Sequence, residues 1–147
     1  MRGWLIALTK NNPQQEIFTL CLIEAGKIFT NTYDYIPGKE TEYPFIFIGE
    51  QFSHDLPNKS AVFGKVTQRI HFYHDDRRRR GDLSSMMGEF LYRLREIKET
   101  RQYHISITDV NSQVIFDTST DKILIHGILE VDFLFNYKGE IKNGRSN

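Results

Sequence analysis

The stretch Lys122–Tyr137, KILIHGILEVDFLFNY, decides the fold. Its side chains alternate as a long β-strand requires, so that residues two apart lie on one face. One face is apolar and carries Ile123, Ile125, Gly127, Leu129, Val131, Phe133 and Phe135. The other mixes apolar and charged side chains, namely Leu124, His126, Ile128, Glu130, Asp132 and Leu134. We expect the first face to pack on the core. The second face is then partly covered by other protein, or the strand extends beyond the core of one subunit.

Upstream of this strand, apolar residues recur at helical spacing from about Asp82 to Thr100. Leu83, Met86, Met87, Phe90, Leu91, Leu94 and Ile97 follow an i, i+3, i+4, i+7 pattern, which predicts an amphipathic helix with Asp82 as its N-cap. Between this helix and the last strand we expect two shorter strands, Tyr103–Thr108 and Val114–Phe116.

The first half of the chain predicts one helix and two strands. Asn12 is a suitable cap for a helix that begins at Pro13, and Gln15 occupies the capping-box position. Tyr43–Glu50 is a strand whose segment Phe45–Ile48 is apolar on both faces, so we expect cover on both sides. Val62–His74 alternates between an apolar and a polar face, which predicts a strand with one side exposed.

Strand pairs that adjoin in sequence favour an α+β fold with an antiparallel or mixed sheet. We expect the two main helices to pack on one face. The whole chain, residues 1–147, reads as a single domain, with loose ends at 1–11 and 138–147.

Composition excludes several classes of protein. The 147 residues (17.3 kDa) carry 19 Lys and Arg against 19 Asp and Glu, which argues against a generally basic nucleic-acid-binding surface. The longest apolar run near the N-terminus, Trp4–Leu8, is too short for a membrane span or a signal peptide. A single cysteine, Cys21, excludes an internal disulfide framework and indicates a reducing compartment. Aromatic residues, at 13%, must be buried in the chain or in a neighbour.

The sequence offers little catalytic chemistry, and we expect neither an enzyme nor a metal or cofactor site. No phosphate-binding glycine loop is present. His71 and His74 point to opposite faces of a strand, and contiguous Ser53-His54-Asp55 cannot form a triad. Cys21 lies on an apolar helix face, and we interpret Glu130 and Asp132 as an exposed or interfacial edge rather than an acid–base pair.

Four adjacent cations, Arg77, Arg78, Arg79 and Arg80, follow Asp75-Asp76 before the second helix. They could contact a nucleic-acid backbone, dock on an acidic protein surface, or form a solvated loop balanced by the two aspartates. Cations are unfavourable at a helix N-terminus. Their position therefore indicates a role other than stabilising the subunit.

Several segments in order resemble the tail-completion (tail-terminator, or tail-to-head joining) proteins of long-tailed bacteriophages. The resemblance runs from about Asn12 to Tyr137. It is carried by Pro13–Phe18, Tyr33–Pro37, Tyr43–Phe52, Lys59–His71, Arg80-Gly81 with Met86-Met87, and His126–Phe133.

The resemblance implies a non-enzymatic virion protein, assembled in the host bacterial cytoplasm. It implies a ring, typically of six copies, at the head-proximal end of the tail. Its partners would be itself, the major tail tube protein and a head-completion or connector protein, with no membrane and no specific nucleic acid, although DNA can pass through the ring. Candidate docking residues are Arg77, Arg78, Arg79 and Arg80, and candidate interface residues are Leu124, Ile128 and Leu134, with Phe45–Ile48 as further apolar surface. The alternative is a small nucleic-acid-binding module that uses Arg77–Arg80.

Overall fold

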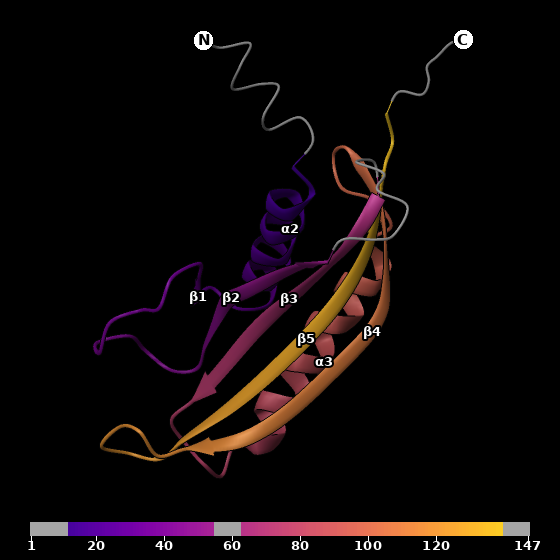
Figure 1. The fold of residues 1–147 in the computed structure, drawn as a ribbon. Helices are drawn as coiled ribbons and strands as arrows, with labels where there is room; N and C mark the ends of the chain where they lie inside the picture. Colours follow the sequence, from indigo (N-terminus) through magenta and orange to yellow (C-terminus); the bar gives the residue numbers. More distant parts are fainter. Residues whose placement is uncertain (1–11, 55–62, 140–147) are drawn as a thin grey trace, which may run out of the picture.

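The structure, a computed structural model, describes residues 12–54 and 63–139. In chain order the elements are α2 (Pro13–Ile28), β1 (Thr32–Tyr33), β2 (Phe45–His54), β3 (Phe63–His74), α3 (Arg80–Glu96), β4 (Tyr103–Asp117) and β5 (Leu124–Tyr137). The strands form one sheet in the order β1-β2-β3-β5-β4, with β1 parallel to β2 and the other neighbours antiparallel. Both helices lie on the same side of this sheet (Figure 1). The predicted α+β class is confirmed.

The start of α2 is as predicted. The Asn12 side chain accepts a hydrogen bond from the backbone N–H of Gln15 at 3.0 Å, and Pro13 occupies the first helical position. The Gln15 side-chain amide donates to Thr19, and the bond from the Gln15 backbone N–H to Asn12 supplies one half of a capping box. Ile17, Cys21 and Ala25 are buried against the sheet side of the helix.

The second helix begins earlier than predicted, and the prediction that Asp82 is its N-cap is wrong. Helix α3 starts at Arg80 with Arg79 at the cap position and no side-chain cap hydrogen bond. Asp82 lies inside the first turn, where its negative charge still favours the positive end of the helix dipole. The helix ends at Glu96, because the backbone of Ile97 is extended.

The two short strands predicted after α3 are one continuous strand. All of β4 pairs with β5, from Tyr103 opposite Tyr137 to Asp117 opposite Leu124, with one irregularity between Ile107 and Asp109. The polar stretch between the two predicted strands hid this continuity. On the outer edge of a sheet, backbone pairing to one neighbour does not need alternating apolar side chains.

Strand β2 also extends past its predicted end at Glu50. Its pairing with β3 is irregular between Ile48 and Gln51 and then resumes to His54. Gln68, which is fully buried, donates its side-chain amide to the carbonyls of Gly49 and Glu50, both at 3.1 Å. This buried amide satisfies backbone groups at the irregularity that the regular ladder leaves unpaired.

Phe45–Ile48 is covered on both sides, though by different means. Ile46 and Ile48 are buried on the helix side. On the other side Phe45 is buried among the rings of Tyr33, Tyr43 and Tyr73, at centroid distances of 5.9, 5.3 and 5.0 Å. Phe47 is half-buried and stacks on His71. Aromatic and imidazole rings of the same chain therefore cover much of the apolar surface of Phe45–Ile48.

The core lies between the sheet and the two helices. A Cβ on Gly127 would lie 2.5 Å from the Met87 sulfur, so α3 packs closely on β5 at this glycine. Phe90 of α3 is fully buried and meets Phe72 of β3 edge-to-face. No helix among the described residues is long and apolar enough to cross a membrane.

We expect Phe90→Ala to lower the free energy of unfolding by about 3–5 kcal/mol, because it opens a cavity where α3 packs on the sheet. Urea denaturation of the purified protein measures the loss. Tyr92→Ala on the same helix, where the side chain is 67% exposed, is the control and should change stability by no more than about 0.5 kcal/mol. Equal losses in the two variants would contradict the packing described here.

Candidate docking surfaces

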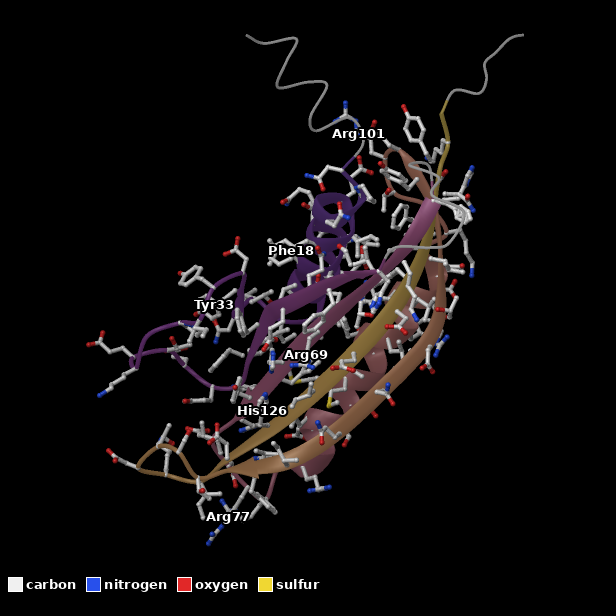
Figure 2. All side chains as sticks on the ribbon, viewed as in Figure 1. Phe18, Tyr33, Arg69, Arg77, Arg101 and His126 are labelled. Carbon is white, nitrogen blue, oxygen red and sulfur yellow. The ribbon has the colours of Figure 1, made fainter. Side chains whose placement is uncertain are left out.

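The face of the sheet that points away from both helices, called here the open face, is the first candidate surface. Figure 2 shows Arg69 and His126 on this side of the molecule. Register and side-chain contacts place on it Glu50, Lys65, Thr67, Arg69, His71, His126, Ile128, Glu130, Asp132 and Leu134. This is the mixed face that the alternation of β5 predicts.

Ion pairs run across the open face from β2 to β5. Arg69 pairs with Glu130, its Nε lying 2.9 Å from a carboxylate oxygen, and also lies 3.6 Å from Glu50. Lys65 pairs with Asp132 at 3.2 Å, and the Thr67 hydroxyl donates to the same carboxylate at 2.5 Å. Glu130 and Asp132 share one face as expected, and each is bound to a cation. They therefore act as ion-pair partners that join β5 to β3.

A chain of imidazole and carboxylate groups continues this network. His71 Nε2 lies 2.7 Å from Glu50 Oε1, and His71 Nδ1 lies 2.8 Å from His126 Nε2. With its Nε2–H donated to Glu50, His71 accepts from the Nε2–H of His126. His126 also stacks on Tyr73 at a centroid distance of 4.1 Å.

Burial raises the pKa of Glu50, but the hydrogen bond from His71 and the charge of Arg69 outweigh burial and leave the pKa below its ordinary value. Burial, together with the proximity of His71, lowers the pKa of His126 from 6.5 to about 4 against the opposing charges of Asp117 and Glu50. At neutral pH Glu50 is therefore an ionised carboxylate and His126 is a neutral imidazole.

The three predicted apolar interface residues are not equally accessible. Leu124 is only 3% exposed, so it has little surface to offer another chain. Ile128 and Leu134 are half-buried on the open face. Of the three predicted residues, Ile128 and Leu134 therefore have exposed surface with which to contact another chain.

The basic segment between β3 and α3 is the second candidate surface. All four arginines, Arg77–Arg80, are exposed, and Figure 2 shows Arg77 at one end of the molecule. Asp76 accepts hydrogen bonds from the backbone N–H of Arg78 at 3.0 Å and from its side-chain Nε at 3.1 Å. The hydrogen bonds and charge of Arg78, with the charge of Arg79, lower the pKa of Asp76 to about 2. Asp76 therefore stays ionised and orders the turn.

The four arginines differ in their partners. Arg79 lies 3.7 Å from Asp76 and 3.3 Å from Asp82, while Arg78 is held by Asp76. Within residues 12–54 and 63–139, neither Arg77 nor Arg80 has an ion pair. Lys122, in the connection between β4 and β5, adds a further cation beside this segment through its pair with Asp75 at 3.3 Å. Two guanidinium groups thus remain available to an external anion.

The remaining chemical candidates have structural roles. His74 Nδ1 accepts a hydrogen bond from the backbone N–H of Asp76, away from His71. Burial raises the pKa of the Cys21 thiol, which is fully enclosed. Across the described ranges, no three His, Cys, Asp or Glu side chains are grouped to bind a metal ion. In the Ser53-His54-Asp55 triplet, Asp55 lies outside the described residues.

Sequence reasoning missed the contact between His71 and His126. These residues are 55 positions apart, and they meet because the β3–β5 register places them diagonally on the open face. It also missed Glu50, which reaches the open face from the irregularity in β2. Neither the register nor the irregularity has a local sequence signal.

The chain is similar to known phage proteins in sequence. The chain is 33% identical over 101 residues to the tail completion protein gp17 of Bacillus phage SPP1, covering 68% of this chain and 73% of that protein. Among solved structures, bacteriophage SPP1 gp17 is 26% identical over 90% of this chain and 93% of that chain, with a TM-score of 0.46. The virion of a native gene transfer agent particle contains a chain that is 11% identical, covering 80% of this chain and 91% of its own, with a TM-score of 0.47. No family model matches.

We expect acid to destabilise the protein partly through His126. Between pH 6.5 and 4 the unfolded chain binds a proton that folded His126 does not, so stability falls as pH falls through this window. Because the side chain is partly exposed, we expect a loss of about 1–2 kcal/mol from this group by pH 4.5. Thermal unfolding at pH 6.5 and 4.5 measures the total loss.

His126→Gln supplies the control for this prediction. Glutamine retains a hydrogen-bonding group toward His71 but does not titrate, so the variant should lose less stability over the same pH interval. Carboxylates whose pKa values His126 does not affect contribute equally to both proteins and cancel in the comparison; Asp117, whose pKa the charge of His126 lowers, is the exception. An identical pH dependence in the two proteins would show that His126 has no such role.

Proposed function

This chain belongs to the family of phage tail completion proteins, and from that premise we propose that it forms a ring that caps the tail tube and joins tail to head. The observation that carries the proposal is the 33% identity to the SPP1 tail completion protein over most of both chains. The chain is accordingly a structural component of a phage virion. The proposed ring has six copies and lies at the head-proximal end of the tail, where it ends polymerisation of the tube.

A subunit in this role needs surfaces for its neighbour, for the tail tube protein and for a head-completion or connector protein. The open face offers a large one, because neither described helix covers it and Ile128 and Leu134 remain partly exposed there. We propose that this face becomes buried in the assembled tail. Its ion pairs are already satisfied within the chain, so that burial would not leave their charges without partners.

The basic segment supports docking to a partner of opposite charge. Arg77 and Arg80 present unpaired cations at one end of the subunit, and opposite charge on a partner would set both register and encounter rate. In the proposed role the protein is not an enzyme and needs no cofactor. DNA can pass through the ring without specific recognition, and assembly takes place in the host cytoplasm.

Electron microscopy of tails tests this function. Tails assembled without the protein should be overlong or ragged, because nothing ends growth of the tube, and adding the purified protein should give tubes of defined length with a terminal ring. Light scattering after size-exclusion chromatography, with and without the tube subunit, gives the mass of the ring. A protein that stays monomeric and leaves the tube ends unchanged would refute the proposal.

We expect the double variant Arg77→Ala, Arg80→Ala to fold normally and to dock poorly. Removing cations from the start of α3 relieves an unfavourable interaction with the helix dipole, so the melting temperature should stay the same or rise slightly. Attachment to the tail or to the head should weaken, as measured by co-sedimentation. Arg95→Ala, at the favourable end of α3, is the matched control.

The same double variant separates the proposal from a nucleic-acid-binding module. A module of that kind would bind arbitrary duplex DNA, with an affinity that falls steeply as salt rises and is lost in the variant. We expect no such binding from the wild-type protein. A large drop in the melting temperature of the variant would instead show that the arginines stabilise the subunit itself.

A further inference from the structure

The connection between β1 and β2, residues 34–44 and called here the arm, carries two apolar side chains that the subunit does not bury. Ile36 is 78% exposed and Tyr35 is 61% exposed. In Figure 1 the arm extends from the sheet on the side away from β4. The ring of Tyr35 rests edge-on against Tyr33 at 5.7 Å, which anchors the base of the arm. Adjacent exposed Tyr and Ile side chains on a projecting loop are suited to insertion into another surface.

A groove of about 420 Å³ lies on a different part of the molecule, between α2 and the segment Thr100–Gln102. Leu20 and Ile23 give it an apolar wall, and Ile23 is 52% exposed. Figure 2 shows Arg101, which lines the groove, well apart from Tyr33 at the base of the arm. Projection and groove are therefore two different surfaces of one chain.

The arm has a net negative charge, and the groove has an exposed cation at its edge. The arm carries exposed Asp34, Glu40 and Glu42 against Lys39. In the groove, the Glu16 carboxylate accepts hydrogen bonds from the Thr100 hydroxyl at 2.7 Å and from the backbone and side-chain amides of Gln102 at 3.0 and 2.6 Å. These donors are neutral, so Glu16 keeps its negative charge, and exposed Arg101 is the one cation among the residues that line the groove. Because Glu16 already has hydrogen-bond donors, exposed Arg101 is the group at the groove to which a carboxylate of the acidic arm is attracted.

We propose that the arm of one subunit inserts Tyr35 and Ile36 into the groove of the next subunit. A contact between two different surfaces of identical chains is heterologous, and its repetition closes a ring when the rotation between subunits permits it. This inference rests on the ring proposed above and names the contact that would close it. The occupant of the groove is then a second copy of this chain.

A pair of cysteines tests the contact directly. Ile36→Cys and Ile23→Cys are combined in one chain, and the purified protein is oxidised in the assembled state with tail tubes. Native Cys21 is fully buried and does not compete. We expect covalent oligomers larger than dimers on a denaturing gel. Each single variant lacks one half of the contact and should yield dimers at most.

Charge and apolar variants give a second readout. Ile36→Asp should reduce the fraction of protein in rings by at least about tenfold, because a carboxylate would be desolvated in the groove. Tyr92→Asp is the matched control on an exposed residue of α3 and should leave ring formation unchanged. Neither change should alter the melting temperature of the subunit, since both side chains lie largely in solvent.

The outcomes separate this inference from the function on which it rests. Rings that form without covalent ladders, and that tolerate Ile36→Asp, would overturn the arm contact and leave the ring intact. A disulfide confined to one chain would show that the arm fills its own groove, which also overturns the inference. If deleting residues 1–10 makes Ile23→Cys more reactive to a thiol reagent in the monomer, the N-terminal segment is the occupant instead. Absence of rings in the wild type would reject the proposed function itself.

Discussion

The antiparallel register between β3 and β5 is the constraint on which the rest of the structure depends. It runs without interruption from Phe63 opposite Asn136 to His74 opposite Ile125. A slip of one residue would turn the buried face of β5 toward solvent and move Glu130 and Asp132 toward α3. The same register joins Arg69 to Glu130 and brings His126 to His71. Core packing and the polar order of the open face are therefore two consequences of one pairing.

The sequence predicted those elements whose signals are local. Alternation in β5 and β3 reported which face meets the helices, and Asn12 with Pro13 located the start of α2. Prediction was wrong where neighbours decide the structure. The polar middle of β4 is a strand because β5 offers it a backbone partner. Glu50 does not end β2, because buried Gln68 satisfies the irregularity there. The start of α3 at Arg80 lacks a side-chain cap, so no residue type marked it.

The candidate sites were likewise predictable where the signal is local and not where neighbouring residues decide the structure. A run of four arginines is visible in any sequence, and their exposure is as expected for a surface segment. Which of them stay unpaired was not predictable, since Asp76 and Asp82 select Arg78 and Arg79 through the geometry of the turn. Leu124 shares the alternation of Ile128 and Leu134 yet is buried, because alternation reports a face of the sheet and not what covers that face. The arm gave no signal, since its exposed side chains become evident only once the core is known.

Zero net charge acquires a physical meaning once the charges are located. On the open face Arg69 pairs with Glu130 and Lys65 with Asp132, so burial of that face would leave neither cation without a partner. The unpaired charges lie elsewhere, with arginines before α3 and acidic residues on the arm. A neutral subunit with separated charges accumulates no net repulsion as copies join, and each local charge still favours one orientation of the partner. The exposed apolar residues Ile36 and Ile23 lie on different surfaces, so the proposed burial of one against the other on a neighbouring copy is a directional, head-to-tail contact, which is the geometry that a closed ring needs.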